Sequence, residues 1–281
     1  MIKGLGTALI TPFKADKSVD YEALARLLDT QLTGAVDYIV VLGTTGEAAT
    51  MTEDEKREVR TFIRQYVNGR LPLVLGVGGN NTAAVCESLR TIDLTGFEAI
   101  LSVCPYYNKP NQEGLFQHFR AVAEASPIPV FLYNVPGRTG VNLLPETVMR
   151  IYEAQPKKIV GIKEASGNIE QIKHLIDLAK DKLMVISGDD GIACEIMEAG
   201  GAGLISVASN AFPEDFYAIV HKKDQAKQAQ YEQMVKLLFK EGNPVGIKAV
   251  LAQKGIIQNY LRLPLVPASA VLQEDIQKEL A

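Results

Sequence analysis

Lys163 has the clearest chemical potential in this sequence, because it lies in a run that otherwise has the character of a buried strand. The run Ile159-Val160-Gly161-Ile162-Lys163-Glu164 is followed closely by Ser166-Gly167. A short apolar run of this kind is typical of a strand covered on both faces. A lysine near a strand end often reaches out to water. A desolvated lysine amine is also a nucleophile that attacks carbonyl carbons.

Gly161 lies two residues before Lys163, and residues two apart share one face of a strand. Because glycine has no side chain, we expect Gly161 to leave space beside the amine for a small ligand. Lys248 occurs in a similar string, Gly246-Ile247-Lys248, but Asn243-Pro244 before it is typical of a helix start. We therefore expect Lys248 to point along a helix surface, and Lys163 is the better nucleophile.

Polar residues follow two other strand-like runs. Thr44 and Thr45 come after Tyr38–Gly43, and Tyr133 closes Pro129–Leu132. Strand alternation predicts that the side chains of Val40, Leu42 and Thr44 lie on the same face of their strand. If these strands are parallel, their carboxyl ends meet at the same edge, where active sites of α/β barrels lie.

Two loops have polar groups suited to an anionic substrate. Gly43-Thr44-Thr45-Gly46-Glu47 offers backbone N–H groups and hydroxyls that can hold a small carboxylate, although an ordinary turn before a helix has the same composition. Arg138, in the loop after Tyr133, can bind a carboxylate through two hydrogen bonds, or it is a surface arginine. The residues alone leave both alternatives open.

Eight strand-like runs alternate with helical patterns over the first 220 or so residues, which predicts a (β/α)8 barrel. Helix starts are marked by Thr52 with Glu55, by Asn168 with Gln171, and by Pro145 and Pro213. The strand-like runs are Leu5–Ile10, Tyr38–Leu42, Leu73–Val77, Ala99–Cys104, Pro129–Tyr133, Ile159–Lys163, Met184–Ser187 and Gly203–Val207.

The strand signal stops near Asp224, and three helical segments follow. They are Gln225–Lys240, Pro244–Lys254 and Ala268–Leu280. We therefore predict a barrel over residues 1–223 and a C-terminal helical extension packed on it over residues 224–281. No segment rich in Pro, Gly or Ser divides the chain.

Composition argues against several classes of partner. The chain has 281 residues, 47% of them hydrophobic, and a net charge of −4 without a basic block. We expect neither nucleic acid nor an anionic membrane surface as a partner. No apolar run approaches about 18 residues, and the N-terminus has no charged and apolar leader, so we expect a cytoplasmic location.

The sequence offers no pattern for a metal or a nucleotide cofactor, and we expect neither. Cys86, Cys104 and Cys194 form no close pair, which argues against disulfides and a zinc site. Asp189 and Asp190 lie far from any histidine and are interpreted as loop and cap residues. Neither a dinucleotide fingerprint nor a P-loop occurs.

Three motifs together resemble the dihydrodipicolinate synthase family, within the pyruvate-dependent class I aldolases. They are Gly43-Thr44-Thr45-Gly46-Glu47, Tyr133-Asn134-Val135-Pro136-Gly137-Arg138-Thr139 and Gly161-Ile162-Lys163-Glu164. The resemblance extends over nearly the whole chain. The first and third motifs are shared with the wider aldolase group, whereas Gly-Arg-Thr after Pro136 favours the synthase family.

The resemblance implies a Schiff-base enzyme of diaminopimelate and lysine biosynthesis. Lys163 would form an imine with pyruvate C2, and the derived enamine would attack the aldehyde of L-aspartate 4-semialdehyde before the product cyclises. An imine acts as an electron sink, so no metal is required.

The resemblance also assigns roles to other residues. Tyr133 would transfer protons at the imine, and Thr44 and Tyr107 would form a proton relay with it. Arg138 would anchor the carboxylate of the semialdehyde. The residues that match the pyruvate pocket are Thr45, Gly188 and Ile205.

Family members are commonly homotetramers built as pairs of dimers, in which the residue matching Tyr107 enters a neighbouring subunit's site. Some are inhibited by lysine at a site matched here by Asn80 and Tyr106. Sensitive members typically carry a histidine or another specific polar group where this chain has Lys56, and a glutamate where it has Ala84. Without the carboxylate of that glutamate, the ammonium group of the lysine effector loses a charge-assisted hydrogen bond, which contributes about 1.5 to 3 kcal/mol to binding. We therefore expect weak or no lysine inhibition.

Two other hypotheses remain. An N-acetylneuraminate lyase or a 2-keto-3-deoxy sugar acid aldolase would use the same imine, but a sugar acid offers hydroxyl groups where Arg138 favours a carboxylate. A protein of another class, a sensor or interaction protein with the same barrel, would bind pyruvate without turnover.

Overall fold

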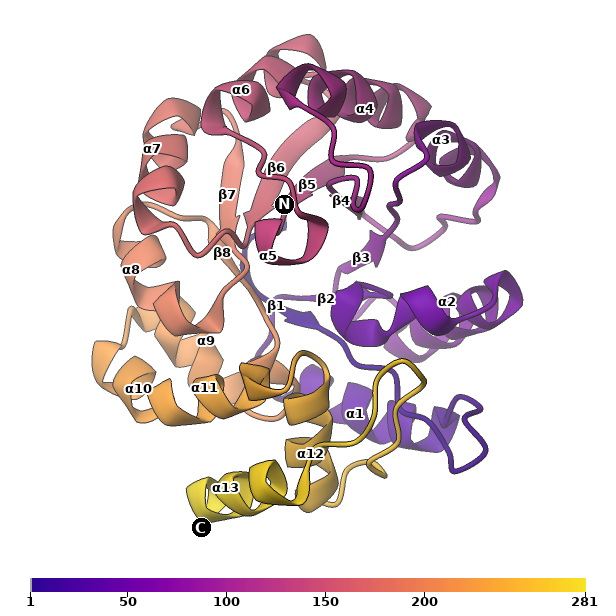
Figure 1. The fold of residues 1–281 in the computed structure, drawn as a ribbon, viewed down its shortest axis with the longest axis vertical. Helices are drawn as coiled ribbons and strands as arrows, with labels where there is room; N and C mark the ends of the chain where they lie inside the picture. The colour runs from indigo at the N-terminus through magenta and orange to yellow at the C-terminus, as the bar shows by residue number, and fades with distance from the viewer. Residues whose placement is uncertain (1) are drawn as a thin grey trace. The chain divides into compact units, whose positions relative to one another are not determined.

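A computed structural model describes residues 2–281, and its eight β-strands form a closed parallel barrel in chain order (Figure 1). This confirms the predicted (β/α)8 fold. Each strand lies within two residues of the limits expected from its apolar run. The strands are β1 (Gly4–Ala8), β2 (Tyr38–Val41), β3 (Leu73–Gly76), β4 (Ala99–Val103), β5 (Val130–Asn134), β6 (Ile159–Glu164), β7 (Met184–Ser187) and β8 (Gly203–Ser206).

The described residues form two compact units. Unit 1 contains Leu73–Ile205, and unit 2 contains Ile2–Pro72 together with Ser206–Ala281. The division expected from the sequence, with a barrel over residues 1–223 and an extension over residues 224–281, stays a prediction.

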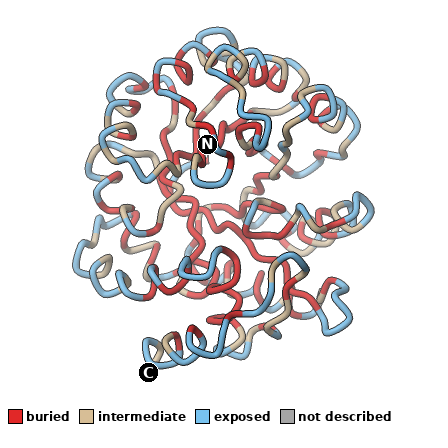
Figure 2. Tube along the Cα trace, in the orientation of Figure 1, coloured by how far each residue is buried: buried red, intermediate tan, exposed pale blue. Residues whose placement is uncertain are grey.

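The strands of unit 1 are buried because they are almost wholly apolar. All five residues of β5 are buried, and so are all of β6 except Val160 (Figure 2). Parallel pairing of β5 with β6 sets Phe131 beside Gly161, Tyr133 beside Lys163 and Asn134 beside Glu164. This register places two polar pairs at the carboxyl ends of neighbouring strands.

Helices alternate with the strands of unit 1, and α4 and α6 pack side by side outside them (Figure 1). Asn81, Asn111 and Asn168 begin three of these helices by accepting a backbone N–H three residues later, which offsets an unpaired helix donor. The helices are α3 (Thr82–Thr91), α4 (Gln112–Ala125), α5 (Pro136–Thr139), α6 (Pro145–Ala154), α7 (Ile169–Ala179) and α8 (Ala193–Glu198), with the 3-10 turn η3 (Asp190–Ile192).

Unit 2 contains β1, β2 and helices from both ends of the chain. The predicted capping box at the start of α2 is present, since Thr52 and Glu55 each bond the other's backbone N–H. The first part holds α1 (Tyr21–Thr33), η1 (Thr44–Gly46), η2 (Ala48–Thr50) and α2 (Glu53–Val67), and the second holds η4 (Ala208–Asn210), α9 (Pro213–Lys222), α10 (Gln225–Gln230), α11 (Glu232–Lys240), α12 (Val245–Gln253) and α13 (Ala270–Leu280).

The C-terminal helices form where the sequence predicts them, with one difference. The expected helix Gln225–Lys240 is divided at Tyr231 into α10 and α11. Every residue of α12 from Val245 to Leu251 is buried, because this helix is apolar nearly all round and packs against α11 and α13. Lys248 is among them, so its predicted surface orientation is wrong.

No helix among residues 2–281 combines the length and apolarity needed to cross a bilayer.

Candidate active site

Lys163 and Tyr133 are brought together by strand pairing. They are register partners on β6 and β5, and their residues are 6% and 7% exposed. The Nζ atom of Lys163 lies 4.5 Å from the centre of the Tyr133 ring. A buried amine therefore lies against a phenol, which is the combination that imine chemistry with proton transfer requires.

Gly188, directly after β7, leaves the space that the Lys163 side chain occupies. A Cβ atom at Gly188 would lie 2.8 Å from Cε of Lys163 and 2.6 Å from Cβ of Ala165. The Gly188 backbone N–H donates to the carbonyl oxygen of Glu164 at 2.7 Å, which fixes this approach. A side chain at this position would displace the lysine.

The space at Gly161 is filled by protein, and the prediction that it accommodates a ligand is wrong. A Cβ atom there would lie 2.3 Å from Cε1 of Phe131 and 2.8 Å from the carbonyl oxygen of Met184. The reason is the register, because Phe131 is paired with Gly161 on the neighbouring strand. Gly161 therefore admits an aromatic ring beneath the Tyr133–Lys163 pair.

A buried carboxyl group follows Lys163 directly. Glu164 is fully buried, and burial raises the pKa of its carboxyl group, while hydrogen bonds oppose that rise. Its oxygens accept from Nδ2 of Asn134 at 3.0 Å and from the backbone N–H of Ser166 at 2.7 Å. The amide of Gln171, on α7, lies at the hydrogen-bonding limit of 3.5 Å.

The same polar network ties both ends of the loop that carries Arg138. Oδ1 of Asn134 accepts the backbone N–H of Leu143 at 2.9 Å, and Nδ2 of Asn134 donates to Oδ1 of Asn142 at 2.8 Å. Nδ2 of Asn142 donates in turn to Gln171 at 2.7 Å. Arg138 itself is exposed, on α5 between these tethers.

This polar network was not predicted from the sequence. Its signal was present, since Asn134 and Glu164 directly follow Tyr133 and Lys163, and buried polar groups at that position need partners.

Tyr107 projects from the loop after β4. It is 89% exposed and has a φ of 74°, a left-handed conformation that is strained for a residue with a side chain. Asn80 and Asn108 brace the loop, since Nδ2 of Asn80 donates to the carbonyl oxygen of Tyr106 at 3.0 Å and Nδ2 of Asn108 donates to that of Asn80 at 2.9 Å. The exposed Tyr107 contrasts with the buried Lys163 and Tyr133.

In unit 2, Thr44 and Thr45 lie in the 3-10 turn η1. Strand β2 ends at Val41 and Leu42 has a φ of 55°, so the strand alternation predicted to include Thr44 does not extend to it. Thr44 is exposed, whereas Thr45 is buried and its Oγ1 accepts from Nδ2 of Asn243 at 2.9 Å.

Two further residues singled out in the sequence, Ile205 and Asp189, lie near the ends of β8 and β7. Ile205 is a buried residue of β8. Asp189 accepts the backbone N–H of Gly191 at 2.8 Å, so it caps a turn as expected. Within residues 2–281, no group of three or more His, Cys, Asp and Glu side chains could hold a metal ion.

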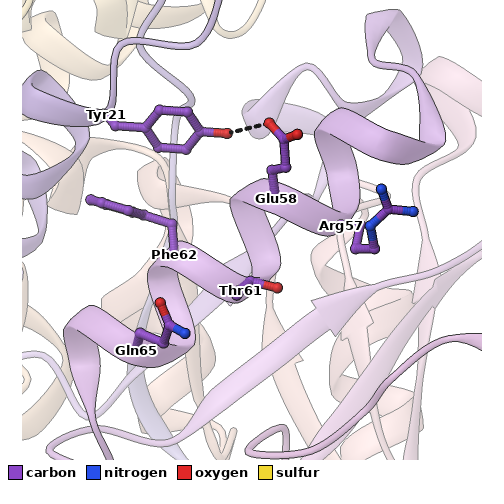
Figure 3. A pocket seen from close by; sticks show the side chains of 6 residues that line it. All are labelled: Tyr21, Arg57, Glu58, Thr61, Phe62 and Gln65. Atoms are coloured by element: carbon purple, nitrogen blue, oxygen red, sulfur yellow. Dashed lines mark hydrogen bonds between the residues drawn. The ribbon is translucent and has the colours of Figure 1, made fainter.

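An open hollow of about 390 Å³ lies on α1 and α2, and none of the predicted site residues lines it (Figure 3). Tyr21 donates from its hydroxyl group to Glu58 at 3.3 Å, and its ring lies 5.0 Å from that of Phe62. The lining residues are Tyr21, Arg57, Glu58, Thr61, Phe62 and Gln65.

Comparisons with known proteins agree with this chemistry. The profile of the dihydrodipicolinate synthetase family matches residues 1–281. A 4-hydroxy-tetrahydrodipicolinate synthase of Parabacteroides distasonis is 49% identical over 286 aligned residues, which cover 99% of this chain and 96% of that protein.

Solved structures give the same result. The crystal structure of dihydrodipicolinate synthase from Thermotoga maritima superposes with a TM-score of 0.96 at 40% identity and covers 100% of this chain and 98% of that one. A monomeric dihydrodipicolinate synthase variant superposes with a TM-score of 0.95 at 40% identity and covers 99% and 95%.

The closed barrel, the buried lysine and these matches define a synthase or lyase of the class I aldolase type. The chain belongs to the dihydrodipicolinate synthetase family. The predictions of this family, of the enzyme class and of 4-hydroxy-tetrahydrodipicolinate synthase function are thereby confirmed. The substrates of the family are pyruvate and aspartate semialdehyde.

Proposed function

We propose that this chain condenses pyruvate with L-aspartate 4-semialdehyde through an imine on Lys163. The supporting observation is the pairing of a buried Lys163 with Tyr133, with Gly188 leaving room for the lysine side chain. The amine adds to pyruvate C2 and water leaves. Loss of a methyl proton gives the enamine, whose carbon bonds to the aldehyde carbon. The amino group of the former semialdehyde then closes on C2 and releases Lys163.

Tyr133 is the proposed proton donor and acceptor in these steps. Its phenol is buried against the amine, where water competes least for the proton. Thr44 and Tyr107 are proposed to relay protons between Tyr133 and water.

Substrate binding is proposed to involve four further residues. Thr45 offers a hydroxyl group to the pyruvate carboxylate, and Gly188 and Ile205 belong to the same pocket. Arg138 binds the semialdehyde carboxylate, since a guanidinium group suits a carboxylate in bidentate geometry. The tethered ends of its loop support a fixed position for this residue.

The proposed assembly is a homotetramer of two dimers in the cytoplasm, in which Tyr107 acts in a neighbouring subunit's site. The exposure and strained backbone of Tyr107 support this role, because strain of this kind persists where function requires it. One of the solved structures similar to this chain is a monomeric synthase variant, so the oligomeric state of this protein has to be measured.

A coupled assay with pyruvate and L-aspartate 4-semialdehyde, run beside N-acetylneuraminate cleavage, tests the proposed substrate pair. We expect turnover of the first pair only, and Arg138→Ala to reduce semialdehyde use while leaving pyruvate binding nearly unchanged. Preferential cleavage of N-acetylneuraminate, with full semialdehyde use by Arg138→Ala, would favour the sugar acid aldolase.

A further inference from the structure

Glu47 and Lys248 form an ion pair that is almost completely removed from water. Their side chains are 1% and 0% exposed. Lys248 Nζ also donates to the carbonyl oxygen of Tyr260 at 3.0 Å and lies 4.2 Å from the centre of the Phe13 ring. Because burying two charges is costly, such a pair is better evidence for a fixed geometry than for stability.

Glu47 is the last residue of the Gly43–Glu47 loop, and its backbone needs support. Its φ of 53° is left-handed, and its N–H donates to the carbonyl oxygen of Thr44 at 3.1 Å. A left-handed residue with a side chain is strained and persists only where surrounding contacts hold it. The ion pair with Lys248 supplies such a contact at this end of the loop.

Asn243 holds the middle of the same loop. Its Nδ2 donates to Oγ1 of Thr45 at 2.9 Å, and the two residues are 7% and 3% exposed. Asn243 lies just before α12, and Lys248 lies within it. One short C-terminal segment therefore contacts the loop at two points.

The charges around the ion pair are also fixed. The backbone N–H of Arg262 donates to Oε2 of Glu47 at 3.2 Å, and its guanidinium group is paired with Glu55 and bonded to the carbonyl oxygen of Lys17. Burial lowers the pKa of Lys248 to about 8, with Glu47 opposing that change and the cations of Arg262 and Lys17 adding to it. The carboxylate of Glu47 is thus held by two separate parts of the C-terminal chain, through the ammonium group of Lys248 and the backbone N–H of Arg262.

We propose that Lys248 and Asn243 are positioning residues that hold the Gly43–Glu47 loop in its pyruvate-binding conformation. This inference rests on the proposed function, which assigns Thr45 to the pyruvate carboxylate. The C-terminal segment then contributes to substrate binding without touching substrate. Loosening the loop weakens pyruvate binding, whereas the rate at saturating pyruvate changes little.

The test varies the pyruvate concentration and reduces the imine with borohydride. The measured quantity is the mass of the adduct on Lys163 in the full-length protein. The variants are Lys248→Met, Asn243→Ala and the double variant Glu47→Gln/Lys248→Met. We expect each to raise the half-saturating pyruvate concentration roughly 10- to 100-fold, with trapping at saturation preserved. Leu251→Ala is the matched control, since Leu251 is equally buried in α12 and we expect an unchanged half-saturation.

The double variant decides the matter if Lys248→Met fails to fold, because it leaves no unpaired charge in the interior. Unchanged half-saturation in the variants that fold would overturn the positioning role and leave a purely structural ion pair. An equal rise in Leu251→Ala would overturn it too. If the wild-type protein traps no pyruvate on Lys163, the proposed function itself fails.

Discussion

At the scale of single residues, two glycines determine what surrounds Lys163. Gly188 lies where any side chain would meet the lysine stem, whereas Gly161 makes room for the Phe131 ring. The first glycine therefore sets the position of the amine, and the second sets the packing beneath it.

We expect Gly188→Ala to slow trapping of pyruvate by Lys163 roughly 100-fold, because the new methyl group displaces the lysine stem. The measurement is the rate of adduct formation with borohydride at saturating pyruvate. Gly137→Ala is the control, since a Cβ atom there meets no heavy atom within 4 Å. Equal rates in the two variants would show that the steric argument is mistaken.

Lys248 gives stability an unusual dependence on pH. Its pKa is lowered from 10.5 to about 8, so between these values the unfolded chain keeps a proton that the folded protein has released. The contribution of this residue to the free energy of unfolding therefore rises with pH in that interval. Burial of the charged amine lowers the stability of the folded protein by a cost of the order of 3 kcal/mol, which is fully present well below pH 8.

We expect the free energy of unfolding in urea, taken relative to Glu47→Gln/Lys248→Met, to increase from about pH 7.5 to about pH 10. The comparison with the double variant removes titrations that both proteins share. A relative stability that stays constant or falls over this range contradicts the assigned environment of Lys248.

At the scale of elements, side-chain amides hold the loop between β5 and α6 at its ends. Asn134 bonds the loop at Asn142 and Leu143, and Gln171 on α7 bonds Asn142. The network couples the position of α5 to the strands that carry Tyr133 and Lys163.

Asn142→Ala should raise the KM for L-aspartate 4-semialdehyde about tenfold and leave pyruvate half-saturation within about twofold, because it releases the loop that carries Arg138. Steady-state assays with each substrate varied measure both quantities. Asn168→Ala removes the cap of the same helix α7 without touching the loop, so it should lower stability by about 1 kcal/mol with KM unchanged. A parallel rise of both constants in Asn142→Ala would argue for general loosening.

Periodicity and caps made the elements predictable, since each strand is an apolar run and helices begin at marked residues such as Thr52 and Asn168. The meeting of Lys163 with Tyr133 was predictable too, because parallel strands bring their carboxyl ends together. The role of Gly161 was not, since it depends on the register with Phe131. Lys248 was misjudged because its partner Glu47 is distant in sequence, and Thr44 because a left-handed Leu42 ends the strand alternation.

At the scale of the whole molecule, the proposed assembly makes each active site depend on two chains. Tyr107 is exposed on its own chain and would act in the site of its neighbour. Lys163→Arg and Tyr107→Phe variants, each weakly active alone, then complement each other in mixed dimers.

We expect a refolded equimolar mixture of these two variants to recover roughly a quarter of wild-type activity, because half of the dimers are mixed and one of their two sites is intact. Analytical ultracentrifugation of the mixture provides the accompanying measurement of assembly. Activity that merely averages those of the separate variants would place Tyr107 outside the neighbouring site.

The most direct measurement of the imine mechanism is borohydride reduction in the presence of pyruvate, followed by peptide mass analysis. The predicted result is one reduced pyruvate on the peptide that contains Lys163, lost in Lys163→Arg. An adduct on another lysine, or no adduct in an enzyme that turns over both substrates, would contradict the assignment of Lys163 as the nucleophile.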